Sequence, residues 1–467
     1  MASIEREDEG VVDVVERASP CADVVIGTRA PSSVVVVAAS LGLMVFMVRV
    51  LGGLWPHDFK IFFPDSFSFL HVAKITPFSP GFYAAERPVA FPTLLFLMGR
   101  STVLTVIVQT LMYGLAYIFA ARSSARILQH RAARILAVFL LVRLALEPRF
   151  ALWNSHILSE SIGMTLAVFS LTTWWLFSAD PTVKRLRWAG LATIAWLTAR
   201  DSNVPPWAAV GVPALLCASF FWKSASADLR RALRRWGVVT LVVCIGIGLA
   251  QAANGRNRYA TLNNVGQRIL TDQQLTTWFV DQGMPMSDDL IERVGSNSFD
   301  DGGKMLNSPN LAEFRTWARG PGQREMLLSY VRFAPHWIKQ LNRDLPVLLH
   351  SDQSAYDAFH VAARLPAAPT SQLGGPTTRL GLVLWIVAVA VALVIALPRR
   401  RVQSVVLGLL MLSCFIDVYI AYVGDSLEVQ RHMVGPLSRM AVVFVLCICM
   451  GIDAALVHVR RGEAVTA

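Results

Sequence analysis

A single aspartate, Asp65, lies among phenylalanines in the stretch FFPDSFSFLH at residues 62–71. The stretch follows the first long apolar run, so Asp65 is expected at the edge of a lipid bilayer. Partial desolvation there would raise the proton affinity of the carboxylate, which suits a general base acting on a hydroxyl group. The alternative is that Asp65 caps the N-terminus of a short helix. Glu86 and Arg87, in ERP at residues 86–88, belong to the same candidate site, Glu86 as a further catalytic carboxylate and Arg87 as a substrate-binding cation.

Polar side chains crowd a second stretch, WNSHILSESIG at residues 153–163, where a long apolar run begins. His156 and Glu160 are the members that could bind or transfer a proton. In the structural interpretation, a serine caps the helix and Glu160 lies favourably in its first turn. Because capping needs fewer polar groups than this stretch supplies, we expect a catalytic role for Glu160 and a substrate-binding role for His156.

A third stretch, TARDSNVPPW at residues 198–207, places Arg200 and Asp201 between two apolar runs. The run before it is short, so these side chains are expected below the level of the lipid headgroups. Polar groups at that depth persist only where they line a cavity or are covered by protein. The stretch therefore predicts a buried polar pocket.

The fourth stretch, GDSLEVQRHMVGP at residues 424–436, precedes the last apolar run and contains Glu428, Arg431 and His432. The cations Arg431 and His432 could clamp an anionic group such as a phosphate. Cations elsewhere in the chain that could join them are Arg200, Arg332 and Arg343. The alternative is a local helical pair between Glu428 and Arg431, worth about 0.2–0.5 kcal/mol.

The composition is that of a membrane protein with several spans. The 467 residues are 54% hydrophobic and only 16% charged, and the mean hydropathy is +0.49. A soluble protein of this length needs more charge to cover its surface. The net charge of +11 does not indicate a nucleic-acid partner, because the basic residues fall in short clusters between apolar runs. That distribution is typical of a chain oriented in a bilayer.

These runs predict an all-α polytopic membrane protein with about ten transmembrane helices, since about 20 apolar residues cross a bilayer. The expected spans are 33–55, 102–120, 134–148, 161–178, 188–200, 204–222, 237–253, 379–397, 403–423 and 433–456. Two of them, 134–148 and 188–200, are short. The second could be only a partial helix, and we keep it because without it the basic stretch at 223–236 would face the opposite side from the basic stretches before it.

With ten spans, that side carries five basic groups, and positive-inside bias places it and both termini in the cytoplasm of a cell-membrane protein. The basic groups are Arg122 to Arg134, Lys184 to Arg187, Lys223 to Arg235, Arg399 to Arg401, and Arg460 with Arg461. By the same topology the acidic side chains of the short connections gather on the external face. Carboxylates near hydrocarbon are usually paired or functional, so the set favours an external active site.

The chain then divides into five parts. Residues 1–32 and 457–467 are expected as cytoplasmic tails, 33–253 as an N-terminal transmembrane module, 254–378 as a large external loop region, and 379–456 as C-terminal transmembrane helices. The first external loop, 56–101, is apolar enough for short interfacial helices. An amphipathic segment beginning at residue 324 is expected to return the chain along the membrane surface.

In their order and sidedness these stretches resemble the GT-C superfamily of membrane glycosyltransferases. The points of resemblance are FPDSFSFL, ERPVAFPTLLFLMG, ILSESIGMTLAVF, LTARDSN and EVQRHMVGP, which together touch the chain from about residue 33 to 456. The resemblance implies transfer of a sugar from a polyprenyl-phosphate donor to a glycan, lipid or protein hydroxyl on the external face, with inversion at the anomeric carbon.

By that resemblance Asp65 is the base or positions the acceptor hydroxyl, Glu86 and Arg87 border the pocket, and Arg431 and His432 meet the carrier phosphate. The sequence departs from larger members in lacking a sizeable C-terminal soluble domain. It also has no second acidic residue adjacent to Asp65. No metal ligands are assigned, and a divalent metal is the only cofactor left open.

Two other functions fit parts of the pattern. A lipid-linked glycan polymerase or ligase also combines many spans with outer arginines, here Arg256, Arg258, Arg268 and Arg343. A transporter would explain charged residues inside spans, such as Arg143 and Asp417, but the two halves of the chain do not match. A nucleotide-driven cytoplasmic enzyme is not supported, because the sequence has no phosphate-binding glycine loop.

Overall fold

In the part of the chain that the structure describes, seven helical stretches are long and apolar enough to cross a membrane. The computed structural model describes residues 42, 62–350 and 375–466, and every regular element in these ranges is a helix. The seven are α5 (Thr102–Ile127), α8 (Ser159–Ala179), Asp201–Phe221, α12 (Ala227–Ala253), α21 (Arg379–Ala396), α22 (Arg401–Gly424), and Val429–Val459 within α23 (Val429–Thr466). The prediction of an all-helical protein with several candidate spans is confirmed.

Three of the ten expected spans are not among these seven. The first, 33–55, lies outside the described residues apart from position 42. The two short ones correspond to α6 (Arg131–Ala145) and α9 (Val183–Leu197), each of 15 residues. At 1.5 Å per residue each is about 22 Å long, less than the bilayer core of about 30 Å.

The Asp201–Phe221 stretch is irregular where it begins. It consists of η2 (Asp201–Asn203), α10 (Val204–Pro206), the π-helical turn η3 (Trp207–Gly211) and α11 (Val212–Phe221). Consecutive prolines at 205 and 206 remove amide donors, which explains why the regular α-helix starts only further along. The side chains of Arg200 and Asp201 therefore enter the bundle from a short 3₁₀ turn.

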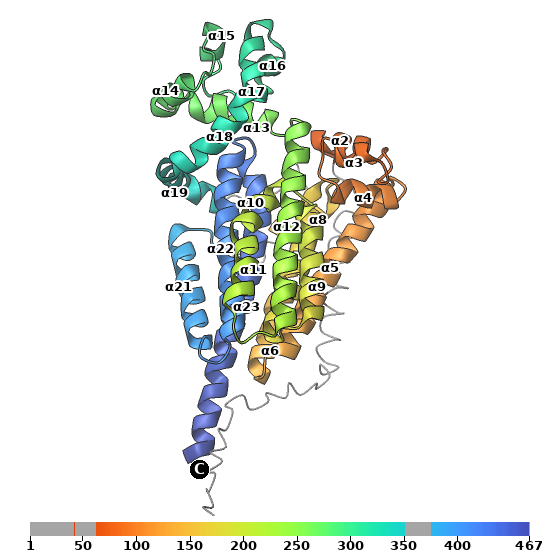
Figure 1. Cartoon of the computed structure of the whole chain (residues 1–467), viewed down its shortest axis with the longest axis vertical. Coiled ribbons are helices and arrows are strands. Elements are labelled where there is room, and N and C mark those ends of the chain that lie inside the picture. Colours follow the sequence, from red (N-terminus) through yellow and green to blue (C-terminus); the bar gives the residue numbers. More distant parts are fainter. Residues whose placement is uncertain (1–41, 43–61, 351–374, 467) are drawn as a thin grey trace, which may run out of the picture.

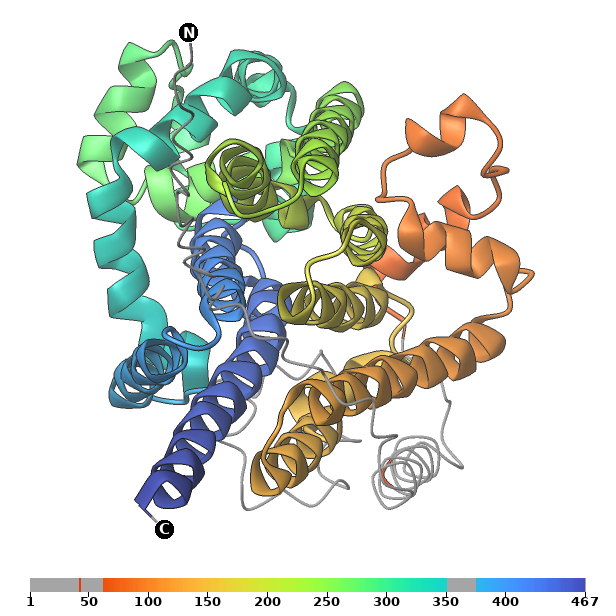
Figure 2. The same ribbon diagram turned by 60° about the horizontal axis from the view of Figure 1, so that its bottom comes forward.

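Helix α8 lies at the centre of the bundle, whereas α12 and α21 lie at its edge (Figure 2) and expose most of their residues. Small polar residues make the close packing of α8 possible. The hydroxyls of Thr165 and Thr172 donate to carbonyls one turn earlier, and Ser170 bonds Thr193 of α9 at 3.2 Å. Small residues that satisfy their own polar groups let neighbouring helices approach in lipid.

Short helices cover the upper end of the bundle in Figure 1. On one side are α2 (Pro64–Val72), α3 (Pro80–Tyr83) and α4 (Ala90–Leu97); between α6 and α8 are α7 (Pro148–Ala151) and η1 (Leu152–Ser155). Residues 254–350, which we call the large region, lie at the same end. The helices of the large region are α13 (Arg258–Asn264), η4 (Val265–Ile269), α14 (Gln273–Asp281), α15 (Asp288–Ile291), α16 (Asp300–Asn307), η5 (Pro309–Leu311), α17 (Ala312–Arg319), α18 (Pro321–Arg332) and α19 (Ala334–His350). The expected amphipathic segment is thus two helices, α18 and α19.

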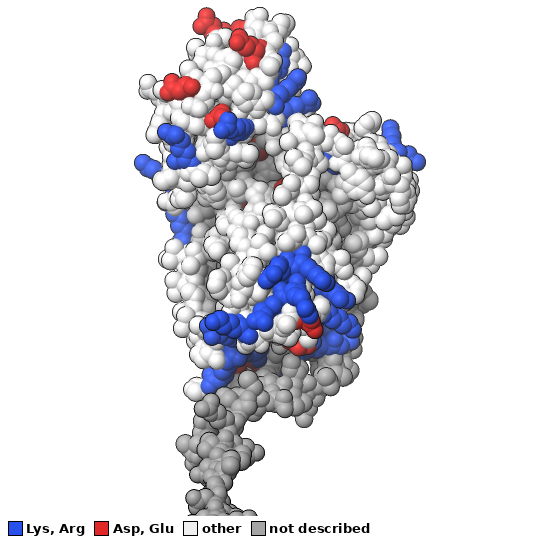
Figure 3. Space-filling model, in the orientation of Figure 1, with Lys and Arg blue, Asp and Glu red and all other residues white. Residues whose placement is uncertain are grey.

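The opposite end of the bundle is basic, and Figure 3 shows Lys and Arg gathered there. One buried carboxylate organises this end. Asp453 of α23 accepts hydrogen bonds from the backbone N–H groups of Gln129 (2.9 Å) and His130 (2.6 Å) and pairs with Arg400. Asp453 thereby joins α23 to the start of α6 and the start of α22.

Candidate functional site

Asp65 lies in the first turn of α2 but does not cap it. The cap comes from Ser66, whose hydroxyl accepts from the backbone N–H of Phe63 at 2.8 Å. The Asp65 carboxylate instead meets two arginines: Oδ1 lies 2.6 Å from Nη2 of Arg87, and Oδ2 lies 3.1 Å from Nη1 of Arg431. The Asp65 side chain is 33% exposed, so its carboxylate is reachable from outside the protein.

Arg431, near the start of α23, binds three carboxylates from three parts of the chain. Its Nε lies 2.6 Å from Oε1 of Glu160. Its Nη1 lies 3.1 Å from Asp65 and 2.8 Å from Oε2 of Glu428. The Arg431 side chain is only 9% exposed. A buried guanidinium surrounded in this way neutralises charges that would otherwise be costly at the membrane edge.

Glu160 is the most buried member, with 1% of its side chain exposed. It lies in the first turn of α8 and also faces Arg200, whose Nη2 is 3.6 Å from Oε1. The same Arg200 nitrogen contacts Nδ1 of His432 at 3.2 Å. We call these seven residues the charged cluster: Asp65, Arg87, Glu160, Arg200, Glu428, Arg431 and His432.

Glu428 reaches Arg431 from an unusual backbone conformation. Its φ of +58° lies in the left-handed region, which costs a non-glycine residue about 1–2 kcal/mol. Glu428 precedes α23, so its bond to Arg431 is not the regular helical pair considered for this stretch. Strain of this kind persists only where surrounding contacts hold it, and it is common at functional sites.

The pKa values of the two accessible carboxylates move in opposite directions. Burial raises the pKa of Asp65, but the charges of Arg431 and Arg87 outweigh it and leave that pKa below its ordinary value. Burial raises the pKa of Glu428, and Arg431 alone does not offset it beside the like charges of Asp65 and Glu160. Asp65 is therefore the more firmly ionised of the two and can accept a proton only if an arginine is drawn away.

His156 lies close to the charged cluster but does not bond to it. It is fully buried, and its Nδ1 lies 3.0 Å from the carbonyl oxygen of Leu152. The Phe63 ring lies between His156 and Arg431, with its centre 6.2 Å from the centre of the imidazole and 5.4 Å from the guanidinium carbon of Arg431. Burial lowers the pKa of His156 to about 4, so the ring is neutral near pH 7. A substrate-binding role for His156 stays a prediction.

Asp201 forms a separate ion pair. Its Oδ1 lies 3.0 Å from Nη1 of Arg256, and Arg256 Nε also donates to the carbonyl oxygen of Ala85 at 2.9 Å. Arg256 thus ties the segment containing Asp65 to the start of the large region. In the sequence, Arg256 fits only the pattern of the polymerase alternative.

Two sets of expected residues lie apart from the charged cluster. Glu86 is exposed and forms no ion pair with any described residue. Arg343 pairs with its neighbour Asp344, and Arg332 lies over Trp278, 6.0 Å from the ring centre. In the described part of the chain, no group of three or more His, Cys, Asp or Glu side chains is placed to hold a metal ion. The divalent metal stays a prediction.

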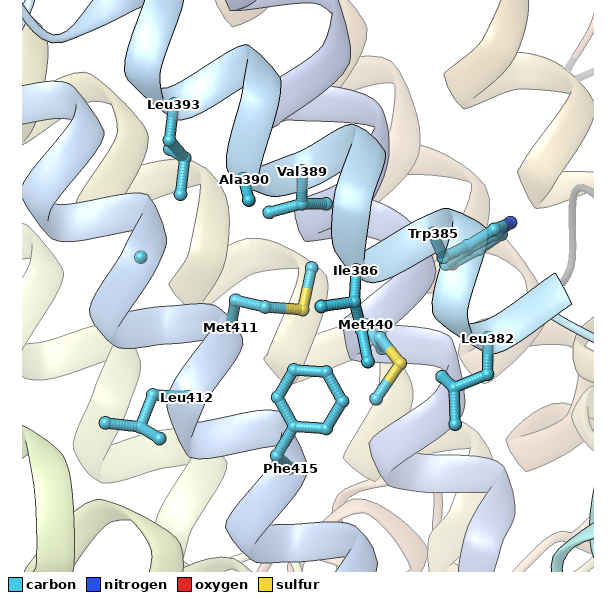
Figure 4. A pocket seen from close by; sticks show the side chains of 11 residues that line it. Leu382, Trp385, Ile386, Val389, Ala390, Leu393, Met411, Leu412, Phe415 and Met440 are labelled. Carbon is cyan, nitrogen blue, oxygen red and sulfur yellow. The ribbon is translucent and has the colours of Figure 1, made fainter. Parts of the chain in front are cut away.

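An apolar cavity of about 240 Å³ lies between α21, α22 and α23, and Figure 4 shows its lining. Leu382, Trp385 and Met411 are among its walls, together with Met440 of α23. Met440 follows Arg431 by nine positions, or about two and a half turns, so it lies on the opposite face of the helix. The cavity is therefore not part of the charged cluster.

No protein-family model, curated protein or solved structure matches this chain. What the site can do rests on its own geometry. It combines a reachable carboxylate held by two arginines with further cations in one partly buried place. Such a set can bind an oxyanion and accept a proton from a neighbouring hydroxyl group.

Proposed function

We propose that this protein is a membrane glycosyltransferase of the GT-C type, which transfers a sugar from a polyprenyl-phosphate donor to an acceptor hydroxyl. One observation carries the proposal: the side chain of Asp65 is 33% exposed and is held by Arg87 and Arg431, at 2.6 and 3.1 Å. A lipid-linked phosphate needs cations at this depth, and an incoming hydroxyl needs a base beside them.

The apolar surroundings of the site suit a donor that arrives through the membrane. Phe67 of α2 is 66% exposed and Phe78 is 92% exposed. Phe78 lies in the turn between α2 and α3, and exposed aromatic side chains on and beside short helices are typical of elements lying in the lipid interface. They lie in the same segment as Asp65, so a lipid carrier could reach the charged cluster without leaving the bilayer.

In the proposed reaction the acceptor oxygen attacks the anomeric carbon while its proton passes to Asp65. The bond from that carbon to the phosphate oxygen breaks, and polyprenyl phosphate leaves with the electron pair. Arg87, Arg200 and Arg431 offset the charge on the leaving phosphate. As the phosphate draws Arg87 and Arg431 toward itself, Asp65 loses its two partners and becomes a stronger base. Attack from the opposite side of the phosphate inverts the anomeric centre.

The first test is the replacement Asp65→Asn in the purified full-length protein. Reconstituted with polyprenyl-phosphate sugars and a hydroxyl acceptor, the unchanged protein should release free polyprenyl phosphate. A positioned general base typically contributes about 10²–10⁴-fold, so Asp65→Asn should slow release by at least about 100-fold. Measurement of polyprenyl phosphate by mass spectrometry checks this.

The matched control is Asp288→Asn, which makes the same chemical change at an exposed position on α15. It should release polyprenyl phosphate at the unchanged rate. Full turnover by a folded Asp65→Asn variant would remove Asp65 as the base.

A transporter is the second candidate, favoured by a buried ion pair between spans. Nη2 of Arg439 in α23 lies 3.2 Å from Oδ2 of Asp417 in α22, and both side chains are almost fully buried. Charged groups inside spans often mark a transport pathway. Uptake of solute into proteoliposomes, with no release of polyprenyl phosphate from any sugar donor, would favour this function over sugar transfer.

A further inference from the structure

A polar cleft lies beside the charged cluster, between the large region and the upper end of α22. It consists of two cavities of about 450 and 540 Å³ that share Asp272, Gln340 and Arg343 in their walls. The cleft is therefore continuous along α19. Its volume is in the range of sites that hold small organic ligands.

Positive charge predominates in the cleft. Its walls contain four cationic side chains, Arg268, Lys339, Arg343 and Arg379, against two carboxylates, Asp272 and Asp344. Both carboxylates already have partners, because Asp272 bonds His336 at 3.2 Å and Asp344 bonds Arg343 at 2.9 Å. Among the described residues, Arg343 is the only one of the four cations that forms an ion pair.

Arg268 forms the inner wall of the cleft. Its guanidinium carbon lies 4.3 Å from the centre of the Tyr422 ring, and it donates to the carbonyl oxygen of Tyr422. These contacts hold the guanidinium in place without neutralising it. Burial lowers the pKa of Arg268, although the group stays protonated. An added anion would offset this cost of burying the charge.

The remaining wall is suited to hydroxyl groups. Gln267, Thr271, Gln340 and Ser426 supply amide and hydroxyl groups, and the Ser426 hydroxyl forms no hydrogen bond with any described residue. Leu348 and Val429 are the purely aliphatic side chains that line either cavity. Acyl chains of a phospholipid need an apolar slot, so this lining favours a saccharide.

We propose that this cleft binds an acidic saccharide, a sugar chain with carboxylate or phosphate groups, as the acceptor of the reaction. The proposal rests on the proposed function and names its acceptor class. Ser426 and Val429 line the cleft, while Glu428 and Arg431 belong to the charged cluster. The link at 425–429 therefore separates the two sites by a few residues, and a chain bound in the cleft can extend one hydroxyl toward Asp65.

The test is binding of a tetrasaccharide of galacturonic acid to the full-length protein in neutral-lipid nanodiscs, measured by calorimetry. Neutral maltotetraose is the comparison. Arg343→Gln and Lys339→Gln change exposed side chains, so both variants should fold. Each should weaken binding of the acidic tetrasaccharide about tenfold, the equivalent of one charge-assisted hydrogen bond. Arg324→Gln is the control, since Arg324 is 80% exposed on α18 and does not line the cleft.

Preference for the acidic over the neutral tetrasaccharide, lost in both cleft variants and kept in Arg324→Gln, supports the proposal. Equal binding of the two probes, no binding, or binding that Arg343→Gln leaves unchanged overturns it. Loss of saccharide binding in nanodiscs with anionic phospholipid would assign the cleft to lipid headgroups instead. The Asp65→Asn variant should bind the probe normally, so failure of the proposed sugar transfer and failure of this inference are distinguishable.

Discussion

The guanidinium of Arg431 forms ion pairs with Asp65, Glu160 and Glu428, so the three carboxylates share one cationic partner. At this scale the residue types could be predicted from the sequence, since all three carboxylates stood out beside apolar runs. Their shared partner could not, because the pairing of Asp65 with Arg431 spans 366 positions. Nothing local in either stretch specifies the other.

We expect Glu160→Gln to destabilise the folded protein. The substitution keeps the shape of the side chain but leaves a buried Arg431 with one fewer carboxylate. Removing one partner of a buried ion pair costs about 3–5 kcal/mol. The free energy of unfolding, measured in mixed detergent micelles, checks this.

The control for that experiment is Asp228→Asn, whose partner Arg231 is equally exposed on the protein surface. An exposed pair is worth about 0.2–1 kcal/mol, so this variant should unfold almost as the unchanged protein does. Equal effects of the two substitutions would contradict the description of Glu160 as part of a buried cluster.

His156 should make stability depend on pH between about 4 and 6.5. Its pKa of about 4 in the folded protein lies below the ordinary value of 6.5, so the unfolded chain binds the proton more readily. The contribution of His156 to the free energy of unfolding is therefore fully present above pH 6.5. It decreases as the pH falls toward 4, by about 3 kcal/mol in total. Comparing unfolding of the unchanged protein and His156→Gln across this range isolates the effect; identical pH profiles would contradict it.

At the scale of elements, the breaks between helices position the charged cluster. The prolines after Asn203 delay α11, and the left-handed Glu428 turns the chain into α23. The interfacial helices α2 and α4 were expected from apolar content. The expected spans 134–148 and 188–200 begin and end later than α6 and α9, because the basic residues in the first turns of both helices were assigned to the connections.

Close packing of α9 against α12 can be tested at Gly190. A Cβ atom there would lie 2.4 Å from the Trp236 ring, so Gly190→Ala should destabilise the protein by about 1–3 kcal/mol through overpacking. Gly246 on α12 has open space around it, and Gly246→Ala should stabilise by up to about 1 kcal/mol. Thermal unfolding of the two variants checks this, and stabilisation by Gly190→Ala would contradict the packing.

The whole molecule has two unlike ends. The charged cluster, the short helices α2–α4 and the large region lie at one, and Lys and Arg gather at the other. The positive-inside rule predicts that the second end faces the cytoplasm. The function we propose requires this orientation, because the lipid-linked donor is used on the external face.

Single cysteines would establish the orientation. In intact cells, an impermeant maleimide should label Asp288→Cys in the large region and leave Ser224→Cys, in the connection before α12, unlabelled until the cells are permeabilised. Both positions are exposed. The unchanged protein measures the background from native cysteines, and the reverse pattern would place the charged cluster in the cytoplasm.

The class of the molecule follows from local sequence alone. Hydropathy and the clustering of Lys and Arg are properties of short stretches, so they predict helices, candidate spans and sidedness without knowledge of contacts. Three features required knowledge of the folded chain. Arg431 binds Asp65, Glu160 and Glu428, Glu86 lies outside the charged cluster, and Arg256 pairs with Asp201. Ion pairing depends on distances of a few ångströms between distant parts of the chain, and helix packing sets those distances.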